Sequence, residues 1–501
     1  MKKVKFLSLL LVFIMLIAAI ASCSGGDNES AETTAKANGE NQGDVAESTE
    51  GELTAEQIRN AVSDDLPEED FGGYNFRMYY FGETIGDEIC PAEISGDVIM
   101  DAVYERNMAV EERFNIKITA INSGFTAWDQ FTNSEKNIIM AGDDAFDLSF
   151  GHIIGAPNNS LEGLYMDFHQ IPYLNFDKPW WQDAAVNELT LNGKMFVASN
   201  DLSIQGIASS KVIFFNKARL KDYNMDEPYQ AVFDHKWTLD SLISQTKDVF
   251  EDINGDGVAD RNDFYGYISH RSQNGFLVSF EMPVLKRTND ASLLQIDIYS
   301  DKMISLVEKV FDWYFAEKGT FIINGNDPDT GHNETQWQAD LFADGRSLYA
   351  FSLLNMAAST FRLSDVEYGI LPFPLWDEKQ AEYITFSSGL IMCVPVTNQN
   401  LDRTGVIIEA MSAEGYKQVI PAYFETALKD KFTFDTESGQ VLDIINNSRA
   451  ISFAYAYDNW QGFGHCLGSI FSSNSKDFTS YYEGRIKMAE TRLGVIVEAF
   501  S

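Results

Sequence analysis

Strand and helix patterns alternate between residues 74 and 150, and this order narrows the possible folds more than any other feature. The strand segments alternate apolar with polar side chains, and the helix segments repeat apolar side chains every three or four residues. The predicted elements are strand 74–81, helix 97–114, strand 115–121, helix 128–140 and strand 146–150. This β-α-β-α-β order predicts an α/β fold in which helices cover a parallel sheet.

The helix predicted at residues 97–114 has one apolar face. Arg106 and the glutamates of this segment are expected on the opposite face, in contact with solvent. The side chains expected to face the core are Val98, Met100, Val103, Met108, Val110 and Phe114.

Length and charge limit the possible architectures and partners. The chain has 501 residues, which is too long for one hydrophobic core, so at least two domains or lobes are expected. Its formal net charge of -38 argues against a nucleic acid partner, because neutralising phosphates requires clustered Lys and Arg side chains. The simplest role of this charge is to keep the protein soluble.

Residues 1–22 have the features of a signal peptide. Three lysines precede an apolar stretch at residues 6–20, which is shorter than the ~20 residues that span a bilayer. The sequence Ala21-Ser22-Cys23 is similar to a bacterial lipobox, in which the cysteine is acylated, palmitate being a common acyl chain. We therefore expect a lipoprotein anchored through Cys23 at the extracellular face of the cell membrane. The alternative is an ordinary secretory signal with a chance cysteine.

Residues 23–65 contain almost no aromatic or large aliphatic side chains. Such a segment cannot bury enough surface to fold alone, so an acidic, disordered tether is predicted. If Cys23 carries lipid, Cys90, Cys393 and Cys466 remain, and three cysteines allow at most one disulfide. Their spacing fits no zinc site, and most of them are expected to be buried as small apolar residues.

Residues 211–266 combine several strong local patterns. An apolar run at residues 212–215 predicts a buried strand, and a short helix is expected at residues 218–221. Thr238 is predicted to cap a helix that extends to about Phe250, where an acidic loop follows.

Three segments, in the same order along the chain, resemble the extracellular solute-binding proteins (family 1) that serve sugar-importing ABC transporters. They are Val-Glu-Glu-Arg-Phe-Asn at 110–115, Phe-Phe-Asn-Lys at 214–217 with Trp-Thr-Leu-Asp at 237–240, and Glu-Tyr-Gly-Ile-Leu-Pro-Phe-Pro-Leu at 367–375. The resemblance runs, with interruptions, from about residue 70 to the end. It implies a two-lobed, periplasmic-binding-protein-like fold of type II, with a ligand-binding cleft between discontinuous lobes.

The same resemblance implies the extent of each lobe. Lobe 1 would comprise residues 66–205 together with 372–435, and the first crossing between the lobes would lie near residues 199–206. Lobe 2 would comprise residues 206–371. Residues 436–501 would return to lobe 2 or pack across both lobes.

Sugar recognition requires flat aromatic faces for C–H surfaces and polar groups for the sugar hydroxyls. In the family topology, the loops at strand ends and lobe crossings would supply these groups. The candidate ligand-binding residues are Glu83, His152, Trp180, Trp181, Asp201, Tyr267, Asn355 and Ser388. The alternative for each is an ordinary structural role. Trp180 and Trp181 cannot both face the same side of a strand, so one of them is expected in the core.

An acidic loop at residues 252–263 has the spacing of a calcium-binding loop. Its oxygen donors fall at loop positions 1, 3, 5, 7, 9 and 12, and Gly257 occupies position 6, where a sharp turn is required. The predicted ligands are Asp252, Asn254, Asp256, the carbonyl of Val258, Asp260 and Asp263. The Asp at position 12 makes the loop similar to dockerin-type loops, which predicts a structural Ca²⁺. The alternative is an acidic turn without an ion, in which four carboxylates would repel one another.

The resemblance implies a monomeric, lipid-anchored receptor that closes around a carbohydrate, expected to be an oligosaccharide, and delivers it to the permease subunits of an ABC importer. No enzymatic activity is expected, since the sequence has no phosphate-binding Gly-rich loop and no Gly-x-Ser-x-Gly or His-Glu-x-x-His motif. Two alternatives stay open. One is a secreted carbohydrate-active enzyme with paired carboxylates, and the other is a binding or sensor lipoprotein without a transporter.

Overall fold

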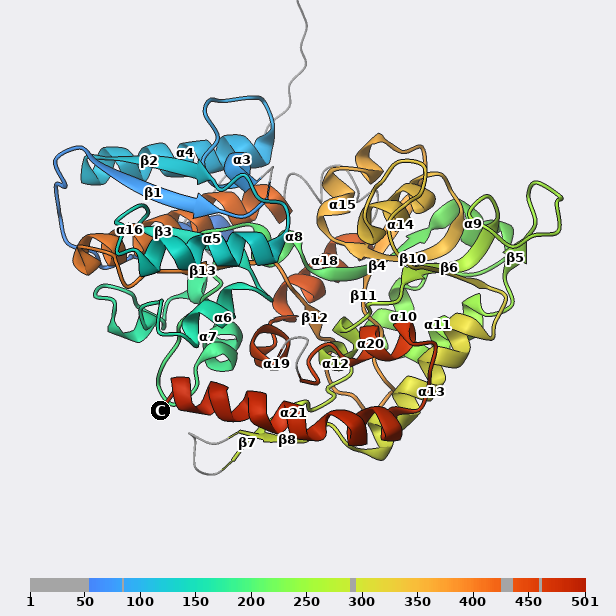
Figure 1. Cartoon of the computed structure of the whole chain (residues 1–501). Coiled ribbons are helices and arrows are strands. Elements are labelled where there is room, and N and C mark those ends of the chain that lie inside the picture. Colours follow the sequence, from blue (N-terminus) through green and yellow to red (C-terminus); the bar gives the residue numbers. More distant parts are fainter. Residues whose placement is uncertain (1–53, 83–84, 289–293, 425–435, 459–461) are drawn as a thin grey trace, which may run out of the picture. The chain divides into compact units, whose positions relative to one another are not determined.

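The computed structural model describes residues 54–82, 85–288, 294–424, 436–458 and 462–501. Two main sheets, each with its own helices and a hydrophobic core, form two lobes (Figure 1). The α/β, two-lobed architecture predicted from the sequence is therefore confirmed. The segments connecting the lobes come from widely separated parts of the chain, so both lobes are discontinuous in sequence.

Lobe 1 is built on a four-stranded sheet with the strand order β13-β3-β1-β2. Strand β1 pairs in parallel with β2 and β3, whereas β13 runs antiparallel to β3. The strands are β1 (Tyr74–Tyr80), β2 (Ile116–Asn122), β3 (Leu148–His152) and β13 (Leu390–Cys393). The helices and helical turns are α2 (Ala55–Asn60), α3 (Ile85–Ile89), α4 (Val98–Phe114), α5 (Trp128–Met140), α6 (Ala156–Ser160), η1 (Phe168–Gln170), η2 (Pro179–Trp181), α7 (Asp183–Leu189), α16 (Leu401–Glu414) and η4 (Gly415–Val419).

The predicted alternation in lobe 1 is confirmed, with one error on the surface of α4. The helix begins after Asp97, whose carboxylate accepts hydrogen bonds from the first-turn N–H groups. Val98 and Met108, expected in the core, are exposed, whereas Arg106, expected outside, is fully buried. The Arg106 guanidinium donates to the Ile89 carbonyl at 3.1 Å and to Asn107 Oδ1 at 2.7 Å, so its charge is buried with hydrogen-bond partners.

Order begins earlier than the sequence predicts. Helix α2 lies inside the segment predicted to be a tether, and Thr54 caps it through a reciprocal hydrogen-bond pair with Gln57. Shortly after it, the buried Asp64 carboxylate accepts a hydrogen bond from Arg113 of α4 at 2.5 Å. The prediction of a disordered tether is therefore wrong for residues 54–65. The signal peptide, Cys23 and the rest of the predicted tether lie outside the described residues.

Lobe 2 is built on a six-stranded sheet with the order β11-β4-β10-β6-β5, and β9 also pairs with β6. Strand β4 runs antiparallel to both of its neighbours, whereas β6 is parallel to β9 and β10. The strands are β4 (Lys211–Asn216), β5 (Phe250–Glu251), β6 (Phe264–His270), β9 (Thr320–Ile323), β10 (Ser347–Leu353) and β11 (Tyr368–Pro372). The helices are α9 (Lys217–Asp222), α10 (Tyr229–Phe233), α11 (Leu239–Thr246), α12 (Gly275–Ser279), α13 (Asp301–Phe315), α14 (Glu334–Ala343), α15 (Asn355–Ala358), η3 (Phe361–Leu363) and α18 (Thr436–Asn447).

Helix α11 starts as predicted and ends early. Thr238 caps it by accepting a hydrogen bond from the Ser241 N–H at 3.2 Å. The helix stops at Thr246 instead of about Phe250, because Gly266 of β6 packs directly against the Thr246 backbone. A Cβ atom at Gly266 would lie 2.2 Å from the Thr246 carbonyl oxygen, so only glycine allows this crossing.

Several short elements connect the lobes or lie beside the connections. They are α8 (Gln205–Ala208), β7 (Leu285–Arg287), β8 (Leu294–Ile296), β12 (Thr385–Phe386), β14 (Arg449–Ala450), α19 (Phe453–Tyr457) and α20 (Cys466–Ser472). The last helix, α21 (Phe478–Ala499), runs along both lobes (Figure 1). Its Phe478 and Ala489 belong to the core that fills lobe 2, and Leu493 and Ile496 to the core of lobe 1. The C-terminal segment therefore packs across both lobes.

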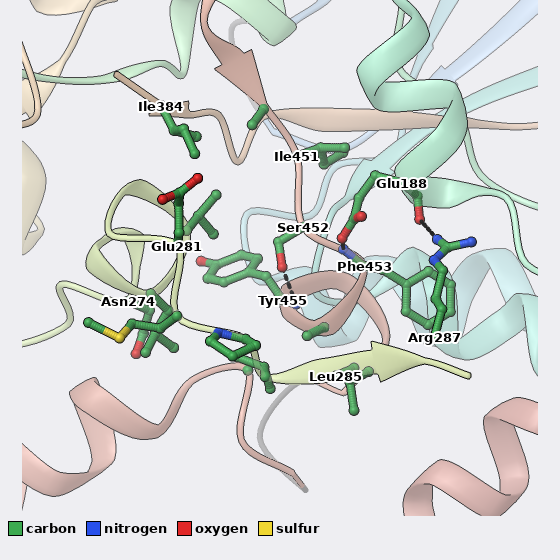
Figure 2. Close-up of a pocket in the computed structure, with 18 of the residues that line it drawn as sticks. Glu188, Asn274, Glu281, Leu285, Arg287, Ile384, Ile451, Ser452, Phe453 and Tyr455 are labelled. Atoms are coloured by element: carbon green, nitrogen blue, oxygen red, sulfur yellow. Dashed lines mark hydrogen bonds between the residues drawn. The ribbon is translucent and has the colours of Figure 1, made fainter. Parts of the chain in front are cut away.

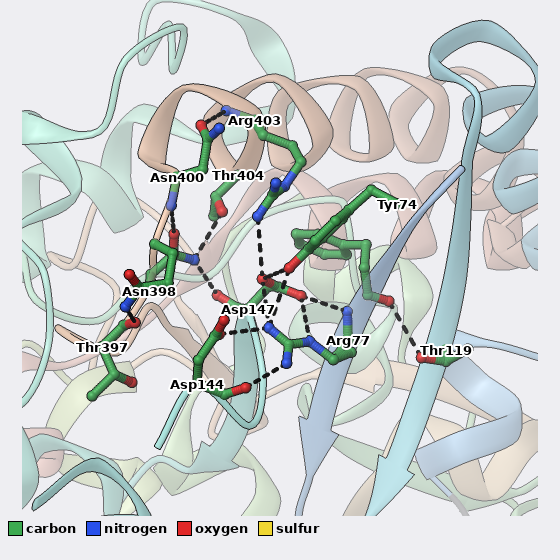
Figure 3. Close-up of polar contacts among 12 residues, drawn as sticks. Tyr74, Arg77, Thr119, Asp144, Asp147, Thr397, Asn398, Asn400, Arg403 and Thr404 are labelled. Atoms are coloured by element: carbon green, nitrogen blue, oxygen red, sulfur yellow. Dashed lines mark hydrogen bonds and ion pairs between the residues drawn. The ribbon is translucent and has the colours of Figure 1, made fainter. Parts of the chain in front are cut away.

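A buried carboxylate organises the end of lobe 1 where β3 begins (Figure 3). The side chain of Asp147 is fully buried and accepts hydrogen bonds from the Tyr74 hydroxyl at 2.8 Å and from the Arg77 N–H at 2.8 Å. Arg77 Nε donates to it at 3.1 Å, and Arg403 Nη2 lies 4.0 Å away. We refer to Tyr74, Arg77, Asp147 and Arg403 as the Asp147 network. It links β1, the start of β3 and α16, so it is a structural element of lobe 1.

Candidate ligand-binding site

Strand ends from both lobes meet around one lysine. Lys211 is the first residue of β4 and His270 the last residue of β6, both in lobe 2, whereas His152 is the last residue of β3 in lobe 1. A third imidazole, His465, immediately precedes α20. Lys211 and His270 both lie against the ring of Phe351, at 5.5 and 5.2 Å from its centroid, and the charge of Lys211 also acts on His152 and His465. We call Lys211, His152, His270 and His465 the Lys211 cluster.

Aromatic rings enclose the Lys211 cluster. The Lys211 ammonium lies 5.5 Å from the ring centroid of Phe351, and also 5.5 Å from that of Phe386. The ring of Tyr455 packs against Phe386, with centroids 4.9 Å apart, and against His465, with centroids 4.0 Å apart. Such rings offer the flat apolar faces that bind the C–H surfaces of a sugar.

Burial controls the protonation of the cluster. Desolvation lowers the pKa of Lys211 to about 8. Desolvation, followed by repulsion from Lys211, lowers the pKa of His152 to about 4 and that of His270 to about 3. The pKa of His465 falls to about 4, chiefly through desolvation. At pH 7 the three imidazoles are therefore neutral, and Lys211 carries the positive charge of the cluster.

No carboxylate in the described part of the chain forms an ion pair with Lys211, and desolvation is the single cause of its pKa shift. The Glu334 carboxylate lies 3.8 Å from His270 Nδ1. The cluster is therefore a partly buried positive charge surrounded by neutral rings. An arrangement of this kind can attract an anionic group and can donate hydrogen bonds from its ammonium and imidazoles.

A cavity of about 360 Å³ adjoins this cluster at Tyr455 (Figure 2). Its wall combines Glu188 from α7 of lobe 1 with Asn274 and Arg287 from lobe 2, and a lobe connection supplies Tyr455. Figure 2 shows Glu188 and Arg287 together on one side and Glu281 on the other. A cavity of this size lies within the range that holds small ligands, and its wall mixes apolar with polar groups.

The polar groups of this wall are held in position from both lobes. The Glu188 carboxylate accepts a hydrogen bond from the Phe453 N–H at 2.8 Å, and burial raises the pKa of Glu188. Arg287 Nη2 donates to the Glu188 carbonyl oxygen at 2.7 Å. These contacts join α7, β7 and the start of α19, so any movement of one lobe against the other would change the cavity.

Two of the predicted ligand-binding residues lie at the Lys211 cluster. His152 is a member of it, and its ring packs edge-on against Phe81 with centroids 5.7 Å apart. Ser388 lies near Tyr455, whose pKa burial raises to about 12. Glu83 lies outside the described residues. The ligand-binding role of all three stays a prediction.

Trp180 and Trp181 lie in a different environment from the one expected. They form a 3-10 turn instead of part of a strand, so adjacent residues do not alternate in direction, and both indoles are fully buried in the core of lobe 1. Both indole N–H groups donate to one carboxylate, that of Glu409, at 3.0 and 2.8 Å. Burial raises the pKa of Glu409 to about 7. The expectation that only one of these indoles is a core residue was wrong.

The remaining three candidates occupy separate places. Asp201 is buried where the chain leaves lobe 1, accepts a hydrogen bond from Gln182 at 2.9 Å and has a pKa that burial raises to about 6. Tyr267 is fully buried in the core of lobe 2. Asn355 follows β10 at the start of α15, and its Oδ1 has no hydrogen-bond partner among the described residues. The Tyr267 hydroxyl likewise has no hydrogen-bond partner among the described residues.

Sequence reasoning missed the centre of the cluster. Lys211, Phe351, Phe386 and Tyr455 were not among the candidates, although the lysine stands directly before an uninterrupted apolar strand. A charged residue at such a strand end is a signal that could have been used, because the ends of strands in α/β lobes are where ligands bind. The aromatic rings carried no comparable signal, since most aromatic residues of this chain are ordinary core residues.

The acidic loop at residues 252–263 has the backbone of a tight, Asp-stabilised turn. The Asp252 carboxylate accepts hydrogen bonds from Gly255 and Gly257 at 2.7 and 2.9 Å, and Gly257 has the positive φ expected at position 6. Asp263 is fully buried and accepts from Ile253 and from Asp260, both at 3.1 Å. Among the described residues, no three acidic, His or Cys side chains converge on a point where they could hold a metal ion. The donors fit Ca²⁺ by type and spacing, and the ion stays a prediction.

The cysteines that the structure describes are free thiols. Cys393 and Cys466 are fully buried and Cys90 is partly buried. None of the helices in the described part of the chain has the length and hydropathy of a membrane-spanning helix.

Comparison with known proteins gives matches in structure only. No family model matches the sequence, and no curated protein matches it. An ABC substrate-binding protein of Listeria monocytogenes, in complex with cycloalternan, superposes with a TM-score of 0.55 at 13% identity, covering 84% of this chain and 99% of that one. The chain has the fold of ABC-transporter substrate-binding proteins.

Two further structures give the same result. The galacto-N-biose-/lacto-N-biose I-binding protein of an ABC transporter from Bifidobacterium longum, in complex with lacto-N-biose, has a TM-score of 0.55 at 12% identity and covers 86% of this chain and 98% of its own. A solute-binding protein from Agrobacterium radiobacter in complex with ribitol has a TM-score of 0.54 at 12% identity, with 84% and 100% covered. Each match spans the whole substrate-binding protein, so both lobes are included.

Proposed function

We propose that this chain is the solute-binding component of an ABC importer and that its ligand is a carbohydrate. The observation that carries the proposal is the two-lobed fold, whose neighbours are substrate-binding proteins in complex with a cyclic oligosaccharide, a disaccharide and a polyol. The gap between the lobes supplies the chemistry that such ligands need. It contains an aromatic face at Tyr455 and a hydroxyl group at Ser388.

The mechanism is capture by closure. A ligand that contacts groups on both lobes stabilises the closed arrangement, so binding shifts an equilibrium between open and closed forms. Lobe 1 contributes His152, lobe 2 contributes Lys211, and Tyr455 lies on a connection between the lobes. The closed form would then be recognised by the permease subunits. In this proposal the protein acts as a monomer and catalyses no reaction.

The position at the membrane is part of the same proposal. Acylation of Cys23 would hold the protein at the extracellular face of the cell membrane, close to the permease. Metabolic labelling with palmitate tests this directly, because a Cys23→Ala variant should lose the label and appear in the medium. Retention of the label in that variant would contradict the anchor.

A thermal-shift screen over mono- and oligosaccharides tests the ligand class. A true ligand at 100 times its Kd should stabilise the folded protein by about 2.7 kcal/mol, which appears as a higher melting temperature. Tyr455→Ala should weaken binding of that sugar about tenfold by removing a stacking face. Tyr173→Ala is the matched control, because Tyr173 is 43% exposed and lies outside the cluster. A screen in which no saccharide shifts the melting temperature would contradict the proposal.

A further inference from the structure

The Lys211 cluster has an unbalanced charge, and this imbalance bears on the identity of the ligand. In the described part of the chain Lys211 has aromatic rings and neutral imidazoles around it and no carboxylate partner. Three other lysines over aromatic rings, Lys178, Lys217 and Lys309, pair with carboxylates, and Lys302, over Trp376, donates to the Phe280 carbonyl at 2.6 Å. Lys309, for example, lies 4.6 Å from the Trp376 ring centroid and pairs with Asp240 at 2.7 Å. A partly buried cation without a partner is costly, so its presence between the lobes requires an explanation.

We infer that the ligand carries an acidic group that pairs with Lys211, and that it is an acidic saccharide whose carboxylate belongs to a uronic acid. This inference rests on the proposed function, because it names the class of saccharide that the same site would bind. A carboxylate placed between the lobes would supply the negative charge that the described residues do not supply at Lys211. The ring of Tyr455 would bind the apolar face of the same sugar.

The charge of the cluster favours a carboxylate over a phosphate ester. Lys211 contributes one positive charge, and His152 and His270, whose Nδ1 atoms accept from backbone N–H groups, contribute uncharged Nε2–H donors at pH 7. A uronate carries one negative charge, which one lysine neutralises. A phosphate monoester carries about -1.5 to -2 at pH 7 and would leave a buried negative charge without a partner.

The position of Lys211 also links binding of the ligand's acidic group to closure of the two lobes. Lys211 lies at the lobe 2 end of the site and His152 at the lobe 1 end, and they are close enough for the lysine charge to lower the pKa of the imidazole. A carboxylate bound between them would contact both lobes at once. Closure around an acidic sugar would then be favoured over closure around a neutral sugar of the same shape.

Isothermal titration calorimetry of the purified chain tests the inference with matched ligands. The panel contains uronic acid disaccharides, the neutral disaccharide of the same stereochemistry for each, and the corresponding sugar phosphates. We expect a uronide to bind best, and Lys211→Met to weaken that binding by at least about 30-fold. Affinity for the neutral counterpart should change less than threefold. Lys211→Arg should retain much of the uronide affinity, and Lys309→Met, the control, should retain all of it.

Proton uptake gives a second readout that does not depend on the variants folding equally well. At pH 8.5 about half or more of the free protein has an uncharged Lys211, so binding a carboxylate should draw a proton onto it. The binding enthalpy measured in two buffers of different ionisation enthalpy reports this uptake, which a neutral sugar should not produce. The other groups facing Lys211, the three imidazoles, stay neutral at this pH.

Each outcome has a distinct meaning. Preference for the neutral disaccharides, or equal binding of acidic and neutral members, overturns the acidic ligand and leaves the proposed function in place. Preference for the sugar phosphates overturns the choice of carboxylate. Binding of no member of the panel overturns the proposed function together with this inference.

Discussion

Asp147 and Lys211 are both charged residues beside the end of a strand, but they differ in the partners that surround their charges. The Asp147 carboxylate, at the start of β3, is satisfied by the Tyr74 hydroxyl, the Arg77 N–H and the Arg77 guanidinium (Figure 3). Lys211, at the start of β4, has aromatic rings at 5.5 Å and no carboxylate partner in the described residues. Among the described residues, the first charge has partners of opposite charge and the second has none.

This difference separates a structural charge from a functional one. A buried ion that is fully paired connects the elements that supply its partners, as the Asp147 network connects β1, β3 and α16. A buried ion without a partner lowers stability, and sites with such perturbed groups are where ligands bind. The two ends of the strands thus have separate roles: one end is fixed by ion pairs, and the other is left for a molecule that the chain does not contain.

Among these predictions, removing the Asp147 charge should have the largest effect on the free energy of unfolding. Asp147→Asn leaves the Arg77 guanidinium without its most buried partner, so we expect the free energy of unfolding to fall by about 3 kcal/mol. Urea-induced unfolding measures the change. Asp144→Asn is the matched control, because Asp144 also pairs with Arg77, at 2.6 Å, but is exposed.

The control variant should lower the free energy of unfolding by no more than about 0.5 kcal/mol. Equal effects of the two variants would contradict the view that burial makes the Asp147 network structural. Neither variant should change ligand affinity, since the network lies at the opposite end of β3 from His152.

Removing the Lys211 charge should raise the free energy of unfolding, whereas removing the Asp147 charge should lower it. Lys211→Met keeps an apolar stem between the rings of Phe351 and Phe386, so we expect the unliganded protein to gain about 1 kcal/mol of stability at pH 7. The gain is kept small because the lysine is only partly buried. Urea-induced unfolding of both proteins without ligand measures it.

The pH dependence of this gain follows from the lowered pKa. Lys211 has a pKa of about 8 in the folded protein and 10.5 in the unfolded chain, so between these values the unfolded chain binds more protons. The free energy of unfolding of the original protein should therefore rise with pH across this window, compared with that of Lys211→Met. Above about pH 10.5 the two proteins should no longer differ in stability through this charge. A variant that is less stable than the original at every pH would show that Lys211 has a stabilising partner, which would break the comparison.

The sequence was sufficient to predict lobe 1 and much of lobe 2, because both depend on local apolar periodicity. Helix α5 has the predicted bounds, and Thr238 caps α11 as predicted. The errors arise where distant segments meet. Helix α11 ends at Thr246 because Gly266 crosses it, and Arg106 is buried because carbonyls from other segments accept its hydrogen bonds. Neither contact is encoded in the periodicity of the helix itself.

The candidate site was harder to predict than the fold for the same reason. Its members come from β3, β4, β6, β10, the β12 connection and α19, and their charge balance exists only after folding. A sequence shows that Lys211 is charged, but the absence of a partner is a property of the assembled lobes. The two tryptophans illustrate the opposite error, since their composition suggested a ligand-binding surface and Glu409 holds both in the core.

The acidic loop at residues 252–263 is intermediate between the Asp147 network and Lys211. Of the predicted effects on stability, the one at this loop is the smallest. Its carboxylates are satisfied in part by backbone N–H groups, as at Asp252. We expect 1 mM calcium to raise the melting temperature by about 0.5 °C, which corresponds to roughly 0.5 kcal/mol for a chain of this size.

Asp256→Ala should abolish this rise, because it removes the ligand at position 5 while leaving the Asp252 and Asp263 turns intact. Asp248→Ala is the control, since Asp248 lies just before the loop and pairs weakly with Lys247 at 3.8 Å. Differential scanning fluorimetry with calcium, magnesium and chelator measures the shift. The same melting temperature in all three conditions would mean that backbone N–H groups alone satisfy these carboxylates. The loop would then resemble the Asp147 network, whose charge is satisfied within the protein, and would need no bound ion.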